Sequence, residues 1–148
     1  MSGAARPGTY ALILQSRRRT TLSIGRRGEL ALTPGYYVYV GSAFGPGGVA
    51  ARVARHFRRV KKKHWHIDYL REALVPVVAW CSYEAERLEH RWAGAFRDLP
   101  GMTPVPGFGC SDCRCDAHLF RCRRMPDADA FSRRSGSRVD TLAFPVGD

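Results

Sequence analysis

Residues 35–68 decide the fold of this chain, and they read GYYVYVGSAFGPGGVAARVARHFRRVKKKHWHID. The first part predicts a strand, because residues 36–40 are all aromatic or β-branched. Gly41 ends this strand, and a turn rich in glycine follows at residues 45–48. After the turn the apolar residues recur at helical spacing, at Val49, Val53, Phe57 and Val60. The stretch therefore predicts a strand, a tight turn and an amphipathic helix in succession.

A basic row runs beside the apolar stripe of this helix. Its members recur at steps of four, three and four residues, and they are Arg52, His56, Arg59 and Lys63. Between residues 52 and 63 the chain has seven Lys or Arg residues and no acid. A strand, a glycine turn and a basic helix together can bring tyrosine hydroxyls, backbone N–H groups and guanidinium groups to one phosphate. The alternative is a solvated basic helix after an ordinary turn.

The composition favours one globular domain with a polyanionic partner. The chain has 148 residues, enough for one domain with a core, and its hydrophobic content of 45% argues against disorder. Its 24 Lys and Arg exceed its 13 Asp and Glu, and the net charge of +11 favours contacts with nucleic-acid phosphates. No apolar run is long enough to cross a bilayer and no secretory signal is visible, so we expect a cytoplasmic protein without a membrane partner.

The chain is expected to have a flexible leader at residues 1–7, a folded domain at residues 8–125 and a polar, weakly ordered tail at residues 126–148. The first strand, at residues 8–15, has a nearly continuous apolar run, which predicts burial on both faces. It leads into an antiparallel meander of short strands. The further expected elements are strands at residues 21–24, 29–32, 76–83 and 118–123 and helices at residues 48–63, 64–73 and 84–99.

Two tripeptides connect the expected strands to a known family. They are Gly8-Thr9-Tyr10 in the first strand and Tyr39-Val40-Gly41 in the strand before the basic helix. With Arg52 in that helix and a glutamate in a later helix, the chain resembles the GIY-YIG nuclease superfamily. Three further segments narrow the resemblance to a branch known only as a domain of unknown function: GSA at residues 41–43, HWHIDYL at residues 64–70, and GFGCSDCRC at residues 107–115 leading into HLF at residues 118–120.

This resemblance implies both a fold and a chemistry. The fold is α/β (α+β), a small three-stranded antiparallel sheet flanked by helices, and the activity is metal-dependent hydrolysis of phosphodiesters, in DNA rather than RNA. The metal is Mg²⁺ or Mn²⁺, held by a single glutamate and several waters. One alternative is a nucleic-acid-binding module with weak or no turnover, because the chain contains no asparagine and active relatives usually have one near the site. A domain this small also suggests a partner protein that supplies specificity.

The resemblance carries over to five residues of a candidate catalytic site, which are Tyr10, Tyr39, Arg52, His56 and Glu89. The tyrosines are expected to position or deprotonate a water, the arginine to clamp the phosphate, and the histidine to orient water or donate to an oxygen. The glutamate is the expected metal ligand; Glu84 and Glu86 fit better as acids of a helix N-terminus. A second set is expected to bind the nucleic-acid backbone: Ser42, Arg55, Arg59, Lys62 and Lys63.

Two other clusters of polar residues have alternative interpretations. His64, His66 and Asp68 lie together, and the favoured interpretation is that His66 or Asp68 makes a buried hydrogen bond. Four residues have the composition of a zinc site with irregular spacing: Cys110, Cys113, Cys115 and His118. Buried free thiols are the favoured alternative to zinc at these cysteines.

Overall fold

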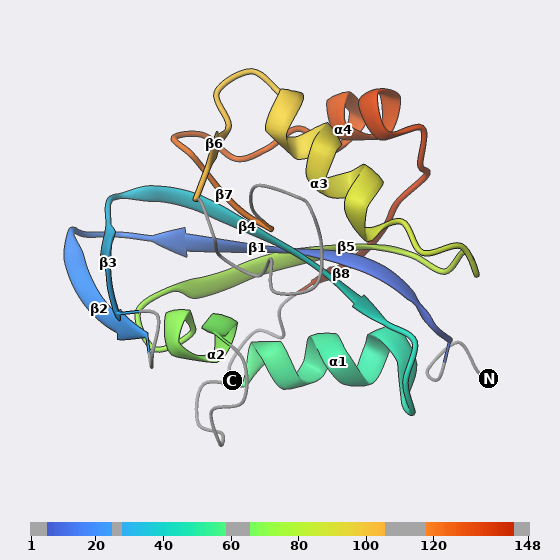
Figure 1. Cartoon of the computed structure of the whole chain (residues 1–148), viewed down its shortest axis with the longest axis horizontal. Helices are drawn as coiled ribbons and strands as arrows, with labels where there is room; N and C mark the ends of the chain where they lie inside the picture. Colours follow the sequence, from blue (N-terminus) through green and yellow to red (C-terminus); the bar gives the residue numbers. More distant parts are fainter. Residues whose placement is uncertain (1–5, 25–27, 59–65, 106–117, 144–148) are drawn as a thin grey trace.

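The computed structural model describes residues 6–24, 28–58, 66–105 and 118–143. Its centre is a six-stranded sheet in the order β6-β7-β4-β1-β5-β8, and β2 and β3 form a separate two-stranded sheet (Figure 1). The strands are β1 (Gly8–Ser16), β2 (Thr20–Ile24), β3 (Gly28–Leu32), β4 (Gly35–Ala43), β5 (Val75–Ser82), β6 (Thr103–Pro104), β7 (Leu119–Cys122) and β8 (Asp140–Ala143). The helices are α1 (Gly48–Phe57), α2 (His66–Leu70), α3 (Glu89–Asp98) and α4 (Ala128–Ser135). All of these neighbouring strands pair antiparallel.

The α+β class is confirmed, but the prediction of a three-stranded sheet is wrong. β1 is buried along nearly its whole length and pairs with β4 on one side and with β5 on the other. The first four residues of β2 and of β3 alternate between half-buried and exposed, and only the last residue of each strand is buried, so the two strands suit a ribbon at one end of the molecule better than the interior of the sheet. The short strands β6, β7 and β8 extend the sheet at its edges.

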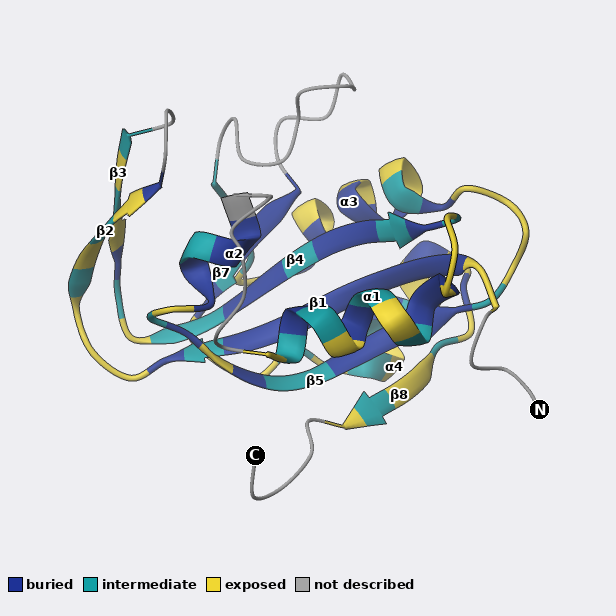
Figure 2. Ribbon diagram, turned by 90° about the horizontal axis from the view of Figure 1, so that it is seen from below, coloured by how far each residue is buried: buried dark blue, intermediate teal, exposed yellow. Residues whose placement is uncertain are grey.

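The six-stranded sheet separates two hydrophobic clusters. α1 and α2 cover one face, and α3 and α4 cover the other (Figure 1). Successive side chains of β1 alternate between them: Leu12 and Leu14 join the α1 cluster, and Ala11 and Ile13 join the α3 cluster. β1 is accordingly buried along most of its length (Figure 2), which confirms the expected burial on both faces.

Two helix boundaries differ from the ranges that the sequence predicts. α1 ends at Phe57 because Arg58 is extended, with φ −72° and ψ 134°, so the helix expected to reach residue 63 stops earlier. α3 begins at Glu89 and not at residue 84. Glu89 therefore stands at the N-terminal end of its helix, where the helix dipole favours a carboxylate.

Residues 128–143 contain α4 and β8 where the composition predicts a weakly ordered tail. Asp127 caps α4 by accepting a hydrogen bond at 2.9 Å from the backbone N–H two residues later, and Gly136 ends the helix with φ 73°. Phe131 is fully buried and stacks on Phe96, with the ring centroids 4.1 Å apart. One aromatic anchor and two caps therefore hold a segment whose composition is mostly polar.

The helices are short, with 10 residues in α1 and α3 and 8 residues in α4. Within the described ranges, none of the helices has the length and apolar character needed to cross a membrane.

Phe131→Ala is expected to lower the free energy of unfolding by about 3–5 kcal/mol, because it removes a fully buried ring from the packing of α4 on α3. Arg134→Ala replaces an exposed residue of the same helix, and it is expected to change the free energy of unfolding by less than about 0.5 kcal/mol. Urea unfolding followed by circular dichroism measures both. Equally small effects of the two substitutions would contradict the packing of α4 against the core.

Candidate active site

Each of the outer glycines of the two tripeptides, Gly8 and Gly41, lies against a neighbouring strand or side chain so closely that an added Cβ atom would overlap with it. The register of β1 and β4 places Tyr10 opposite Gly41. A Cβ atom on Gly41 would lie 2.5 Å from the hydroxyl oxygen of Tyr10 and 2.6 Å from its Cζ atom. A Cβ atom on Gly8 would overlap with the carbonyl oxygen of Ser82 on β5. The two glycines therefore allow β1 to pack closely on both neighbours and make room for the tyrosine ring.

Tyr10 and His56 form a buried pair between the sheet and α1. Each is only 2% exposed, and the hydroxyl oxygen of Tyr10 lies 2.7 Å from Nε2 of His56. The half-buried ring of Tyr39 completes the group, with its centroid 6.5 Å from that of Tyr10 and 6.0 Å from that of His56. His56, a member of the basic row, therefore faces the sheet and is buried. This burial argues against the alternative of a fully solvated basic helix.

Tyr10 is a neutral phenol at physiological pH. Burial raises the pKa of Tyr10 well above its ordinary value of 10.0, and the neighbouring Tyr39 raises it further. Arg52 lowers the pKa through its charge and through hydrogen bonding, but it does not outweigh burial, and Glu89 adds a small upward contribution. A neutral phenol can donate one hydrogen bond and accept others, so Tyr10 can still link His56 to a bound molecule.

Ser42 joins groups from the two faces of the sheet. Its carbonyl oxygen accepts a hydrogen bond from Nη1 of Arg52, on α1, at 3.2 Å. Its hydroxyl donates to Oε1 of Glu89, on α3, at 2.8 Å. Because α1 and α3 cover opposite faces, these two contacts bring the arginine and the glutamate to the same end of β4 (Figure 1).

Besides the hydrogen bond from Ser42, a contact with His118 keeps the side chain of Glu89 ionised. Nδ1 of His118 lies 2.7 Å from Oε2 of Glu89, and the histidine side chain is 3% exposed while that of the glutamate is 25% exposed. Burial alone would raise the pKa of Glu89, but the hydrogen bonds from His118 and Ser42, with the charges of His118 and His90, hold the pKa below its ordinary value. Each carboxylate oxygen keeps a free lone pair after one such hydrogen bond.

Glu89 supplies one carboxylate, which is the number that a Mg²⁺ ion with several waters can take from a protein. Mg²⁺ usually keeps several waters and needs only one or two carboxylates from a protein. Among the described residues, no group of three or more His, Cys, Asp and Glu side chains could hold a metal ion, which disfavours a site made by the protein alone in this part of the chain. In the expected zinc set, His118 contacts Glu89, and the three cysteines lie outside the described residues: Cys110, Cys113 and Cys115.

The structure gathers the five residues of the predicted catalytic set around residues 39–42 of β4: Tyr10, Tyr39, His56 and Arg52 lie together, and Ser42 links Arg52 to Glu89. The two alternative acids do not join the group. Glu84 accepts a hydrogen bond from the hydroxyl of Ser82 at 3.3 Å, and Glu86 lies at an exposed position 3.8 Å from Arg91. The geometry therefore favours Glu89 over both alternatives as the carboxylate of the site.

Arg55, expected to bind nucleic acid, makes a structural contact with α2. Its Nη1 and Nη2 atoms donate to the two carboxylate oxygens of Asp68 at 2.8 and 3.0 Å, and the Asp68 side chain is fully buried. This pair ties α1 to α2, and it gives Asp68, one of the two residues expected to make a buried hydrogen bond that caps the helix, a buried hydrogen bond to an arginine of α1. The other basic residues of that set lie outside the described residues: Arg59, Lys62 and Lys63.

His118 is the site residue whose partner the sequence did not reveal. In the sequence, His118 is the last residue of the candidate zinc set, which points to a metal and not to Glu89. The HLF segment that begins at His118 is the only other feature that marks this residue. In the structure the N–H of Val40 donates to the carbonyl oxygen of His118 at 2.9 Å. That bond places the residue before β7 alongside β4, within reach of Glu89. The contact depends on strand pairing over a long sequence separation, which no local pattern encodes.

Residues 9–140 match the family model described as Domain of unknown function DUF123. The match extends from β1 into β8, beyond the domain end expected at residue 125, so it includes α4. No curated protein and no solved structure matches the chain.

Gly41→Ala is expected to displace the ring of Tyr10 and break its contact with His56, because the new Cβ atom would lie 2.5 Å from the tyrosine hydroxyl. We expect unfolding at a lower temperature and shifted NMR resonances of the His56 ring. Gly45→Ala is the matched control, since a Cβ atom there meets nothing within 4 Å, and it should change neither measurement. Unchanged His56 resonances in Gly41→Ala would contradict the packing of Tyr10 over this glycine.

The raised pKa of Tyr10 is expected to weaken the fold at alkaline pH. Below a pH of about 10 the phenol is neutral in the folded and unfolded states, so its contribution to stability is fully present. Above that pH the unfolded chain loses the proton while the folded chain keeps it, so the free energy of unfolding falls by about 1.4 kcal/mol per pH unit.

Tyr10→Phe removes this contribution. Between about pH 9 and pH 11, the free energy of unfolding measured in urea should therefore fall less steeply for the variant than for the wild type. Between about pH 6 and pH 8, it should change with pH by the same amount in both proteins. Equal alkaline slopes in the two proteins would contradict a buried neutral phenol at this position.

Proposed function

We propose that this chain, which belongs to the family described as Domain of unknown function DUF123, is a metal-dependent endonuclease of the GIY-YIG type that hydrolyses phosphodiesters in DNA. One observation carries the proposal. The five residues that the resemblance assigns to catalysis come from β1, β4, α1 and α3, and direct contacts or contacts through Ser42 link them around residues 39–42 of β4. Convergence from four separate elements supports a shared role for these residues better than independent packing does.

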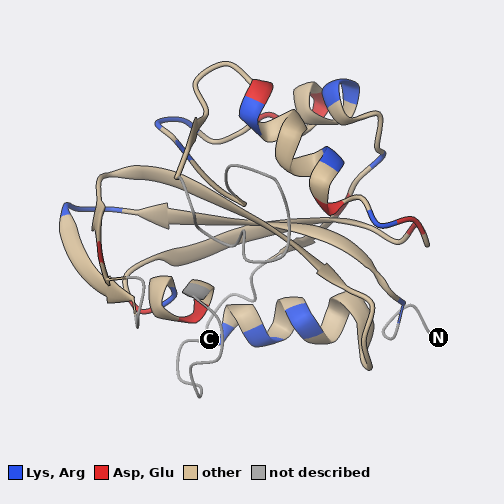
Figure 3. Cartoon of the chain, viewed as in Figure 1, with Lys and Arg blue, Asp and Glu red and all other residues tan. Residues whose placement is uncertain are grey.

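Arg52 is the phosphate-binding group of the proposed site. Its half-buried guanidinium group lies beside Tyr10 and donates to the carbonyl oxygen of Ser42. There it would hold a phosphate oxygen and stabilise the negative charge that develops during hydrolysis. α1 displays arginine and no acid (Figure 3), which favours approach of a nucleic-acid backbone from this side.

Tyr10 and His56 would handle the proton of the attacking water. The 2.7 Å contact lets a proton pass from the phenol to Nε2 of His56 as the phenol oxygen takes one from the water. The charge of Arg52 already opposes the effect of burial on the pKa of Tyr10, which favours such a transfer. Tyr39 lies beside both groups and is half-buried, so it is placed to position the water.

Glu89 would hold the metal ion. A bound Mg²⁺ supplies charge stabilisation to the phosphate and to the leaving oxygen. Ser42 and His118 keep the carboxylate ionised and fix its orientation, because each donates a hydrogen bond to a different oxygen.

The second candidate function is nucleic-acid binding without efficient turnover. The chain has no asparagine, and the pKa of Tyr10 is raised well above its ordinary value. Both observations disfavour the chemical step more than they disfavour contact with phosphates. A partner protein that supplies specificity is compatible with either function.

Cleavage of supercoiled plasmid or of branched DNA is expected to require Mg²⁺ or Mn²⁺ and to stop when EDTA removes the metal. Arg52→Ala and Glu89→Gln are each expected to lower the cleavage rate at least about 100-fold, because they remove the phosphate clamp and the metal ligand. DNA binding by Glu89→Gln should persist and should weaken steeply with added salt.

Glu86→Gln is the matched control for the glutamate variant, because its side chain is 65% exposed and lies outside the contacts of the site. It should cleave at the wild-type rate. Cleavage in EDTA, or cleavage that Glu89→Gln leaves unchanged, would overturn the nuclease assignment. Salt-dependent binding with no cleavage of either DNA substrate would support the binding module instead.

A further inference from the structure

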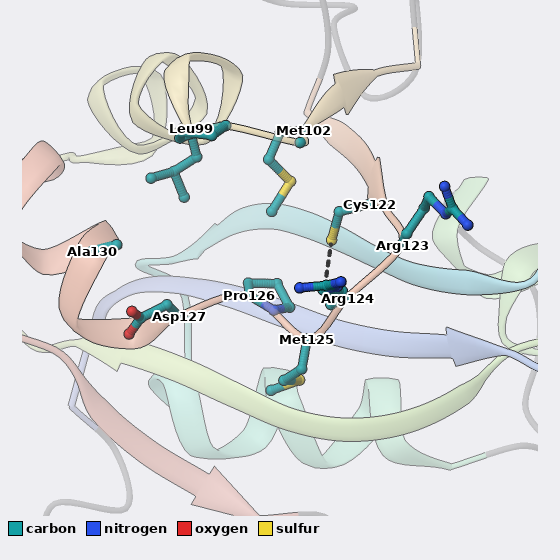
Figure 4. A pocket seen from close by; sticks show the side chains of 11 residues that line it. Leu99, Met102, Cys122, Arg123, Arg124, Met125, Pro126, Asp127 and Ala130 are labelled. Atoms are coloured by element: carbon teal, nitrogen blue, oxygen red, sulfur yellow. Dashed lines mark hydrogen bonds between the residues drawn. The ribbon is translucent and has the colours of Figure 1, made fainter.

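A groove lies between the end of α3 and the start of α4 (Figure 4), and none of the residues that line it belongs to the candidate active site. It consists of two adjoining hollows, with volumes of about 620 and 510 Å³, that share Leu99, Pro100 and Ala130. Figure 4 shows Leu99 and Met102 on one side of the larger hollow and Met125 across from them. Met125 is 41% exposed, so this apolar surface meets solvent.

Four arginines line the same groove. Arg123 and Arg124 follow β7, and Arg133 and Arg134 come from the last turn of α4. All four are exposed, and within the described part of the chain their guanidinium groups have no ion-pair partner. Asp127 is the acid among the lining residues, and its carboxylate accepts the hydrogen bond that caps α4. The groove therefore combines an apolar floor with a positive rim.

The lining favours a peptide over a nucleic acid. Proteins that bind single strands stack the bases on aromatic side chains, and no aromatic residue is among the described residues that line this groove. Methionine side chains adapt to aliphatic partners, and guanidinium groups match carboxylates with two parallel hydrogen bonds. Two hollows side by side suit two anchoring side chains of one extended segment.

We propose that this groove binds a short acidic segment of a partner protein, with aliphatic or methionine side chains in the hollows and Asp or Glu side chains on the arginine rim. α3 connects the groove to the candidate active site, because Glu89 begins the helix and Leu99 caps its end, about 15 Å away along the axis. A partner held here would lie close to the substrate without covering the site. Binding at the groove requires neither metal nor nuclease activity.

A random peptide library displayed on phage, panned against the full chain, tests this proposal. Enriched peptides are expected to carry a net negative charge and at least one Leu, Ile or Met. Their fluorescent synthetic forms should bind the wild type in fluorescence anisotropy. The double variant Arg124→Glu, Arg133→Glu is expected to weaken that binding at least about tenfold, because it reverses the charge of the rim at exposed positions.

Two further variants sharpen the test. Ala130→Glu places a charge on the floor of the groove and is expected to weaken binding as well. Arg138→Glu, an exposed arginine outside the lining, is the matched control and should bind as the wild type does. Thermal unfolding of each variant shows whether the fold is kept. If Ala130→Glu does not fold, the double variant at the exposed arginines still tests the proposal.

Three results would overturn the proposal: no enrichment of peptides, enriched peptides without negative charge, or equal binding to the double variant. Oligothymidylate is measured in the same assay. If the double variant loses oligothymidylate binding while no acidic peptide is enriched, the arginine rim belongs to a nucleic-acid surface and the peptide proposal is wrong.

Discussion

The pairing of β1 with β4 is the constraint on which the rest of the structure depends. It runs through the whole of both strands, from Gly8 opposite Ala43 to Ser16 opposite Gly35. Because side chains alternate between the faces of a sheet, a slip of one residue would move Tyr10 from the α1 face to the α3 face. Close packing of the strands fixes this register, since no side chain fits at Gly41 under the tyrosine ring.

A sheet ordinarily separates side chains that lie on its two faces. In this molecule, groups from both faces come together near the end of β4. β7 pairs with β4 only from Tyr36 to Tyr39, and one further bond reaches Val40. The end of β4 beyond that point receives Arg52 from one helical layer and Glu89 from the other. The residue between them is Ser42, whose backbone and side chain bind different layers. The candidate site therefore depends on the end of β4 that β7 leaves unpaired, more than on either helix alone.

The positions of the tyrosines, the arginine and the histidine within their strands and helix follow from local patterns, and the resemblance is what groups these residues into one candidate site. Tyr10 and Tyr39 stand at strand positions beside glycines, and Arg52 and His56 lie one helical turn apart. Each such placement depends on a few neighbouring residues. Three glutamates compete in the sequence for the role of the carboxylate, and the start of α3 at Glu89 leaves the two alternatives before the helix.

What the sequence could not predict depends on pairing across long separations. β6 has two residues and β8 has four, so neither carries a periodic signal, and both are recognised only by their partners in the sheet. The position of His118 beside the glutamate has the same origin. α4 was missed for another reason: a single aromatic side chain anchors a segment that is otherwise polar, and average composition conceals one residue.

The contact between Tyr10 and Gly41 also has an evolutionary consequence. While the ring occupies that space, position 41 accepts no side chain, so the two positions cannot vary independently. A lineage that first replaces the tyrosine with a small residue is then free to lose the glycine, whereas the reverse order displaces the tyrosine ring. Within the family, chains that carry a side chain at the position of Gly41 should therefore already lack the buried phenol.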